Sequence, residues 1–346
     1  MNNTIDMNRL RCPVIKHPIE FFFSLVDYRN NLFSSKDVNK VIEFYDGFKE
    51  RSEMVEWMKE RPKGASYIFE VEGNREIIVV IATVNFMGEN AKECRETIYK
   101  NLRMIFVESG GKGDFYFNLA HNYNVGIKRA LEYNPKWIVL SNDDVIKLDD
   151  VETLIEKLSS IDNEKYDVVF TTPSKYHSIP AFYSEQRVWR RVLFTISRER
   201  RIQLEIERKF EVNFFSSPIR GYGSFFFKHG YRHLSIADFG IFSTRFIKRH
   251  RELLYDETYI NSGEDVDISL EVTLDVQRLK VIDFQLGDKI GETLGKDVSR
   301  KIRDVAGNAY LNYKIISGNH PASRAVFNSS DRLSFKNRFK RMDSDH

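Results

Sequence analysis

The sequence predicts an α/β fold in which helices flank a mostly parallel central sheet. Between Ile77 and Thr172, short apolar runs suited to buried strands alternate with stretches that have the spacing of amphipathic helices. Such alternation is typical of a sheet built from βαβ units. At 346 residues, 42% of them hydrophobic, the chain has enough material for one large or two ordinary domains.

Composition narrows the classes of function. The formal net charge of +3 is too small to indicate nucleic-acid binding, so we expect no nucleic-acid partner. The two cysteines, Cys12 and Cys94, cannot form a disulfide framework or a zinc site, which is typical of a reducing, cytoplasmic compartment. The apolar runs are shorter than the ~20 residues that a membrane span needs, and the N-terminus lacks the pattern of a secretory signal.

Residues 1–74 are expected to form a mostly helical N-terminal extension, because Val38, Val41 and Tyr45 have helical spacing. The first core strand is predicted at Ile77 to Thr83, where the apolar run is continuous and rich in β-branched residues. A helix with Cys94, Ile98 and Leu102 on its apolar stripe should follow.

The next strand, Arg103 to Val107, completes a predicted βαβ unit. It is followed by Glu108, Ser109 and two glycines. A turn of this kind combines a carboxylate with exposed backbone N–H groups, so it could cradle a nucleoside or a phosphate.

A helix from about Phe117 to Tyr133 leads into the segment KWIVLSNDDV, in which a predicted strand ends at Asn142, Asp143 and Asp144. In open α/β sheets ligands bind beyond the carboxyl ends of the strands, where two aspartates could hold a divalent cation. An Asx turn after a strand explains the same residues without any ligand.

A helix near Val151 to Leu158 and a strand from Tyr166 to Thr172 continue the pattern, which then lapses in an insertion at about 181–235. Within it, residues 186–210 mix arginines with apolar side chains, as do residues 332–342 in the helical and basic tail expected at 301–346. Both segments are suited to peripheral contact with an anionic membrane surface. The alternative is a helix packed on the protein and a solvated tail.

A second carboxylate cluster, NSGEDVDISLE, contains Glu264, Asp265 and Asp267. The alternation of apolar residues after Val266 is typical of a strand. Ser262 followed three residues later by Asp265 instead resembles a capping box, which favours the start of a helix. The acids either cap that helix, or one of them takes a proton from a hydroxyl group.

Taken in order, the segments of the chain resemble the inverting glycosyltransferases of family 2, which have the GT-A fold. The resemblance runs from about Glu76 to Gly295 and rests on IIVVIATVN, FVESGG, NYNVGIKRA, VLSNDDV, DFGIFSTRFI and LLYDETYINSGEDVDISL. It implies a glycosyltransferase domain at 75–300, with a nucleotide-sugar-binding half at 75–150 and an acceptor half at 151–300. It also implies that the second cluster starts a helix.

The resemblance implies roles for individual residues. The residues expected to bind the nucleotide sugar are Thr83, Asn85, Glu108, Ser109, Asn142 and Asp143. Asp144 takes the metal-ligand position of the DXD element, and Phe239 to Arg245 lines the acceptor side. Asp265 takes the position of the catalytic base, with Glu264 beside it. Tyr255, Asp256 and Glu257 match an element that precedes this motif.

One departure from the family concerns the metal site. Many relatives have a histidine near the end of the domain, where this chain has Asp288 and Lys289. Asp288 could replace the histidine as an oxygen ligand, or Lys289 could neutralise the diphosphate directly.

The activity implied is a single displacement with Mn²⁺ or Mg²⁺. The donor is a nucleotide sugar, UDP-linked by preference and otherwise GDP- or dTDP-linked, and the acceptor is a glycan that is potentially lipid-linked. Two alternatives stay open. A nucleotidyltransferase also uses carboxylates and a metal, but IATVNFMGEN lacks a glycine- and arginine-rich phosphate loop. A non-catalytic membrane- or RNA-binding adaptor would instead rely on the basic segments.

Overall fold

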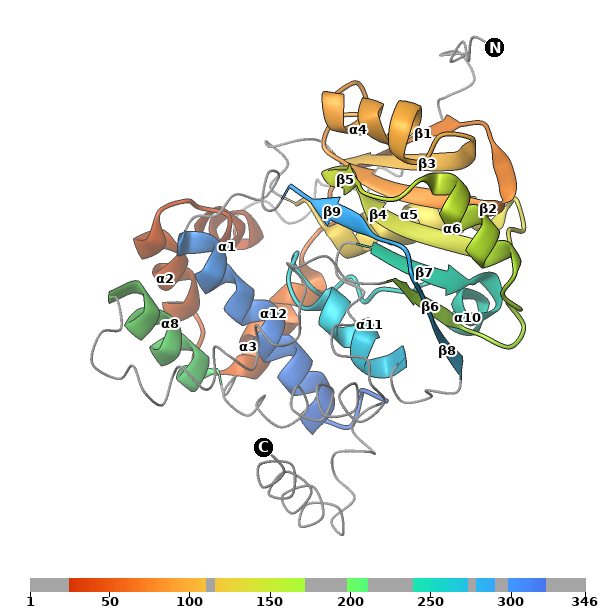
Figure 1. Cartoon of the computed structure of the whole chain (residues 1–346). Coiled ribbons are helices and arrows are strands. Elements are labelled where there is room, and N and C mark those ends of the chain that lie inside the picture. The colour runs from red at the N-terminus through yellow and green to blue at the C-terminus, as the bar shows by residue number, and fades with distance from the viewer. Residues whose placement is uncertain are drawn as a thin grey trace, which may run out of the picture.

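The computed structural model describes residues 25–109, 116–171, 198–210, 239–272, 278–289 and 298–321. A seven-stranded sheet with the order β1-β3-β2-β4-β7-β6-β8 forms its centre (Figure 1). The strands are β1 Ser66–Val71, β2 Asn74–Thr83, β3 Leu102–Ser109, β4 Trp137–Asn142, β6 Val168–Thr171, β7 Phe239–Ser243 and β8 Leu279–Ile282. Five of them run in one direction, and only β1 and β7 oppose them. The expected mostly parallel α/β sheet is therefore confirmed.

The strands β2, β3 and β4 are the middle of this sheet and are almost wholly buried. Every residue of β2 from Ile77 to Thr83 is buried, as the continuous apolar run predicted. Both β3 and β4 pair with β2 in parallel. The carboxyl ends of β2, β3 and β4 therefore lie at the same edge of the sheet. The polar residues at those ends are brought together there.

The helix predicted before β3 is shorter than expected. The helix α4 (Glu89–Glu93) continues into a π-helix, η3 (Cys94–Ile98), and Leu102 begins β3 instead of lying on the helical stripe. Asn101 has φ 74 and turns the chain out of the helix. Asn is among the residues that enter this left-handed region most readily, which allows the short turn from the end of η3 at Ile98 into β3 at Leu102.

Helices cover both faces of the sheet. On one face lie α5 (Leu119–Leu131), α10 (Thr244–Arg249) and α11 (Glu264–Val272), and on the other lie α4, η3 and α6 (Val151–Ser159). The helix α5 packs closely on the sheet at Gly126. A Cβ there would lie 2.3 Å from Val80 and 2.8 Å from Val107, so only glycine lets α5 sit this close to β2 and β3.

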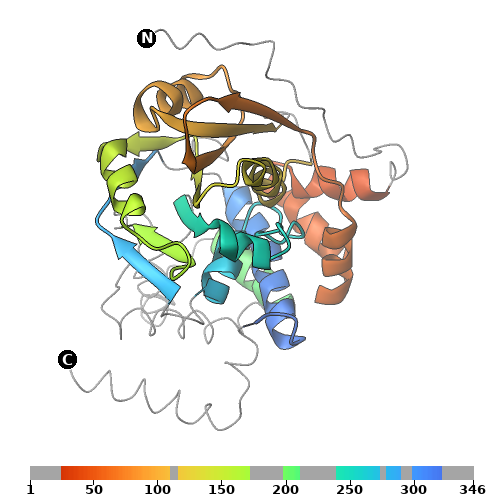
Figure 2. The same cartoon turned by 90° about the vertical axis from the view of Figure 1, so that its right-hand side faces the viewer.

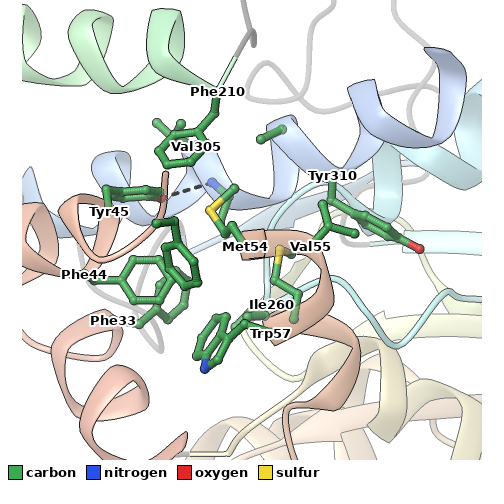
Figure 3. Packing of buried hydrophobic residues seen from close by; sticks show 14 of the residues in the cluster. Phe33, Phe44, Tyr45, Met54, Val55, Trp57, Phe210, Ile260, Val305 and Tyr310 are labelled. Carbon is green, nitrogen blue, oxygen red and sulfur yellow. Dashed lines mark hydrogen bonds between the residues drawn. The ribbon is translucent and has the colours of Figure 1, made fainter. Parts of the chain in front are cut away.

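A second core joins helices that are far apart in the sequence. It contains α1 (Leu25–Phe33), α2 (Val38–Asp46), α3 (Arg51–Glu60), α8 (Arg198–Lys209) and α12 (Val298–Ile316). Figures 1 and 2 show these helices gathered beside the sheet, and Figure 3 shows their aromatic interior. The N-terminal helices and α12 thus form one helical layer. The sheet itself begins at Ser66, inside the expected extension.

The helix α8 belongs to the basic segment predicted at 186–210. Its apolar residue Ile206 and the following Phe210 are buried in the helical core, while Arg198, Arg201 and Arg208 are exposed. Residues 198–210 therefore match the alternative of a packed helix with its arginines in solvent. Residues 186–197 and 332–342 lie outside the described part of the chain. Among the helices of the described segments, none is both long and apolar enough to cross a membrane.

Candidate functional site at the carboxyl edge of the sheet

Polar residues at the ends of three neighbouring strands lie at one edge of the sheet. In the strand register Thr83 lies opposite Glu108, and Ala82 lies opposite Asn142. Asp143 and Asp144 follow directly after β4. The residues expected to bind the nucleotide sugar therefore come from the ends of adjacent strands and from the residues that follow them.

The first aspartate of the pair is anchored by β2. The hydroxyl of Thr83 donates to Oδ2 of Asp143 at 2.6 Å, and both residues are buried. The backbone carbonyl of Asp143 also accepts a weak hydrogen bond from the Cys94 thiol at 3.6 Å. Because its carboxylate is tied to Thr83, Asp143 fixes the course of the chain into Asp144.

The segment expected to replace the family's histidine runs beside Asp144. A two-stranded sheet pairs β5 (Val145–Lys147) with β9 (Leu286–Asp288), and Asp288 lies opposite Val145. The amide of Lys289 donates to the backbone carbonyl of Asp144 at 2.9 Å. The side chain of Asp288 lies outside the described atoms, whereas Nζ of Lys289 donates to Asn90 at 2.7 Å and contacts Glu93 at 3.1 Å. Lys289 is therefore engaged by the start of α4.

Glu108 and Asn85 organise the loop after β2. One carboxylate oxygen of Glu108 accepts from the amide of Phe86 at 2.7 Å. The exposed Asn85 caps the next turn, because its Oδ1 accepts from the amide of Met87 at 3.0 Å. These contacts fix the half-buried Glu108 beside the loop after β2.

Ser109 and Asn122, which both neighbour Ser66 of β1, each carry a buried polar atom. Ser66 of β1 is opposite Ser109 in the antiparallel register and donates its hydroxyl to Oδ1 of Asn122. Among the described residues, Oγ of Ser109 and Nδ2 of Asn122 have no hydrogen-bond partner. Buried polar atoms of this kind usually bind water or a ligand. Sequence reasoning selected Ser109 but not Asn122.

The start of α5 connects this edge to the second carboxylate cluster. Asn118 caps α5 through the amide of His121, and its Nδ2 donates to the carbonyls of Glu257 and Tyr259, both at 2.9 Å. Oδ1 of Asn261 accepts from the amide of Leu119 at 2.8 Å. The segment that leads into α11 is thus fixed at the same edge as the ends of β2, β3 and β4.

Glu257 is the centre of this connection. Its two oxygens contact Nδ2 of Asn124 and Nδ1 of His121, each at 3.0 Å. Burial alone would raise the pKa of Glu257, but the hydrogen bonds from His121 and Asn124 hold it below its ordinary value. Glu257 is therefore a carboxylate at neutral pH and joins α5 to the segment that leads into α11.

A second contact between α5 and the segment before α11 is aromatic. The hydroxyl of Tyr123 donates to Oδ1 of Asn142 at 2.8 Å, and the ring of Tyr123 stacks on Tyr255 with centroids 5.5 Å apart. Tyr123 thus links the first carboxylate cluster to the segment that precedes α11.

The second cluster begins a helix, as the capping pattern and the resemblance predicted. The helix α11 starts at Glu264, and Gly263 before it has φ 95, which glycine adopts without strain. Glu264 is buried and Asp265 is half-buried in the first turn. The period-two interpretation of this stretch is therefore wrong.

Sequence reasoning missed a buried ion cluster behind this helix. Nζ of Lys314, in α12, lies 2.8 Å from Asp267 and 3.0 Å from Asp256. Tyr259 and Tyr310 donate hydroxyl hydrogen bonds to the same two carboxylates. This cluster fixes α11 against α12.

The donor set fits a nucleotide-bound divalent cation. Among the described side chains, no group of three or more His, Cys, Asp or Glu lies close enough together to hold a metal alone. Mg²⁺ is typically held by one or two carboxylates, with phosphates and water as the other ligands. Asp144, buried directly after β4, is a single carboxylate that meets this smaller requirement.

Two comparisons of the sequence with known proteins find no match. No protein-family model matches the chain, and no curated protein matches its sequence.

Proposed function

We propose that the protein is an inverting glycosyltransferase of the GT-A type. In this proposal it moves a sugar from a nucleotide sugar to a hydroxyl group of a glycan, either free or lipid-linked. The observation that supports the proposal is that α5 contacts both the first carboxylate cluster, at Asn142, and the segment 257–261 that leads into the second cluster at 264–265.

The donor side of the proposed site is the edge formed by β2, β3 and β4. Glu108 and Thr83 are the proposed contacts of the nucleoside. The other proposed contacts of the nucleotide sugar are Asn85, Ser109, Asn142 and Asp143. Asp144, assisted by Asp288, is the proposed ligand of Mn²⁺ or Mg²⁺. A bound metal supplies Lewis-acid stabilisation of the departing diphosphate.

The acceptor side is the first turn of α11. Asp265 is half-buried there, so its carboxylate can reach a bound hydroxyl group while remaining anchored. In the proposed displacement Asp265 removes the proton from the acceptor hydroxyl as that oxygen attacks the anomeric carbon. Glu264, buried next to it, supports the turn, and Glu257 stays ionised behind α5.

Peripheral membrane contact remains part of the proposal for lipid-linked acceptors. It now depends on residues 186–197 and 332–342 and on the exposed arginines of α8, because the apolar side of α8 packs inside the protein. Such contact would be electrostatic and therefore sensitive to salt.

The proposal is tested by thermal unfolding with UDP, GDP and dTDP, each with and without Mn²⁺. We expect one nucleotide to stabilise the protein only when Mn²⁺ is present, by about 2.7 kcal/mol at a hundredfold excess over its dissociation constant. Asp144→Asn should abolish this stabilisation, whereas Asp46→Asn, at an exposed site in α2, should leave it unchanged. Equal stabilisation of the wild type and Asp144→Asn, or none by any nucleotide, would contradict the proposal.

A further inference from the structure

We propose that the protein binds a phosphate monoester at a second site, where three arginines surround one buried aspartate. The arginines are Arg245, Arg249 and Arg278, and the aspartate is Asp167. The arginine cluster formed by these four residues lies apart from the carboxylate clusters of the proposed transferase. Phosphate binding there goes beyond glycosyl transfer and does not depend on it.

The arginine cluster lies at the opposite edge of the sheet from the candidate functional site. Trp137, the first residue of β4, pairs with Ser243, the last residue of β7, whereas Asn142 at the other end of β4 belongs to the candidate site. The helix α10, which carries Arg245 and Arg249, begins directly after Ser243. Figure 1 shows α10 beside the sheet and away from the helical layer. An anion bound at this edge therefore does not block the candidate site.

The backbone fixes the position of Asp167. Its amide donates to the carbonyl of Arg278 at 2.8 Å, and its carbonyl accepts from the amide of Ser243, also at 2.8 Å. Asp167 therefore joins the residues at the ends of β7 and β8, which lie on either side of β6. Arg245 and Arg249 lie four residues apart in α10, which places both on the same face of the helix. The four side chains are thus brought together before any ligand binds.

The carboxylate of Asp167 has no capacity left for further donors. Its Oδ1 accepts from Nη2 of Arg245 at 2.7 Å and from Nη2 of Arg278 at 3.0 Å. Its Oδ2 accepts from Nε of Arg278 and from Nη2 of Arg249. A carboxylate offers about four lone-pair sites, and these four bonds occupy them.

The arginine cluster carries more positive charge than Asp167 can balance. Arg278 alone gives Asp167 a two-point contact, so holding β6 to β8 requires neither Arg245 nor Arg249. Three guanidinium groups on one carboxylate leave two positive charges. The next carboxylate, Glu164, is 72% exposed, and its Oε2 lies 3.7 Å from Nε of Arg245, beyond hydrogen-bond distance. An exposed contact of this kind contributes little.

The cluster also has donors that Asp167 does not use. Each guanidinium has five N–H donors, of which the bonds to Asp167 take only one or two. Among the described residues, Nε of Arg245 is buried and has no hydrogen-bond partner. The side chain of Arg249 is 49% exposed, and those of Arg245 and Arg278 are partly exposed. An anion in solution can therefore reach the cluster.

The chemistry of the cluster matches a phosphate monoester. Such a group carries about −1.5 to −2 charges at pH 7, which balances the two charges that Asp167 leaves. Its three terminal oxygens accept hydrogen bonds from several guanidinium groups at once, and the planar fork of arginine fits this geometry. A soluble phosphorylated compound and a lipid headgroup with a terminal phosphate share this chemistry.

Isothermal titration calorimetry with inorganic phosphate at constant ionic strength tests the site. We expect Arg249→Gln to weaken phosphate binding by about tenfold, because it removes charged donors while Arg245 and Arg278 still hold Asp167. Arg208→Gln, at an exposed site in α8, removes the same charge elsewhere and should leave the dissociation constant unchanged. Arg249→Lys keeps the charge but not the fork, so it should lose less affinity than Arg249→Gln.

The absence of phosphate binding in the wild type, or equal dissociation constants in the wild type and Arg249→Gln, would overturn the proposal. The source of the phosphate is resolved with glycerol 3-phosphate and with phosphatidylcholine vesicles that contain or lack phosphatidic acid. Binding of glycerol 3-phosphate alone assigns a soluble ligand, whereas binding to phosphatidic acid vesicles that Arg249→Gln abolishes assigns a lipid headgroup. No nucleotide sugar enters these measurements, so a failure of this site and a failure of the proposed function are distinguishable.

Discussion

Replacing Lys314 by Met should remove the ammonium that holds two buried carboxylates together. Nζ of Lys314 lies 2.8 Å from Asp267 and 3.0 Å from Asp256, and its side chain is 14% exposed. Burial alone would lower the pKa of Lys314, but the charges of Asp267 and Asp256 hold it above its ordinary value. The lysine is therefore charged at every pH at which the protein is handled.

The expected loss in stability comes from the two carboxylates that Lys314→Met leaves without their ammonium partner. Removing one partner of a buried ion pair typically costs about 3–5 kcal/mol, because the remaining charge is buried without compensation. Tyr259 still donates to Asp267, and Tyr310 still donates to Asp256, so part of the compensation survives. We therefore expect a loss near the lower end, about 3 kcal/mol at pH 7.

The loss should also depend on pH. Burial would raise the pKa of Asp256, but Lys314, the amide of Thr258 and Tyr310 hold it below its ordinary value of 3.8. A lowered pKa contributes stability above pH 3.8 that disappears as the pH falls through the pKa of the folded state. The difference between the wild type and Lys314→Met should therefore be largest at neutral pH and shrink below pH 3.8.

Urea unfolding at pH 7 measures this loss, with Lys136→Met as the matched control. Lys136 also reaches a carboxylate, Glu76 at 2.9 Å, but both side chains are more than half exposed. Exposed pairs contribute about 0–1 kcal/mol. If Lys314→Met costs no more than Lys136→Met, the reasoning about the buried cluster is refuted.

Two further changes test how α12 packs on α11. The pKa of Asp304 is raised from 3.8 to about 6, so its charged form costs stability as the pH rises through this range. A pKa shift of one unit corresponds to about 1.4 kcal/mol, so Asp304→Asn should raise the free energy of unfolding by up to about 3 kcal/mol above pH 6. A weaker hydrogen bond to Ser262 should reduce this gain by about 1 kcal/mol. Heat denaturation at pH 8 and at pH 4 checks this, and an equal effect at both would contradict the buried site. Gly307→Ala should lose about 1–3 kcal/mol in urea unfolding despite the better helix propensity of Ala, because its Cβ would meet the carbonyl of Ser262; a gain in stability would exclude that contact.

Strands and helix starts that depend on a short stretch of sequence could be predicted. The β-branched run of β2 can be buried on both faces, and it forms the centre of the sheet. At Glu264 two local signals disagreed, and the helix prevailed because Gly263 adopts a left-handed conformation at its start and α12 packs on that turn. The direction of β7, which opposes its neighbours β4 and β6, is not a property of its composition, so the sequence could not reveal it.

Contacts between distant segments could not be predicted. Asp304 and Lys314 come from a segment that looked like a basic tail, yet α12 brings them to the start of α11. Asn122 is one of several polar residues in α5, and only the strand register shows that it meets Ser66 beside Ser109. Such pairings depend on how helices and strands pack together, which no short stretch of sequence determines.

The most direct test of the central claim is to identify the product released from nucleotide sugars in the presence of Mn²⁺. We expect the wild type to release a nucleoside diphosphate, with water or an added glycan as acceptor. Asp265→Asn should lose this activity while nucleotide binding is retained. Release of pyrophosphate instead, or a rate in Asp265→Asn equal to that of the wild type, would contradict the assignment of glycosyl transfer to this site.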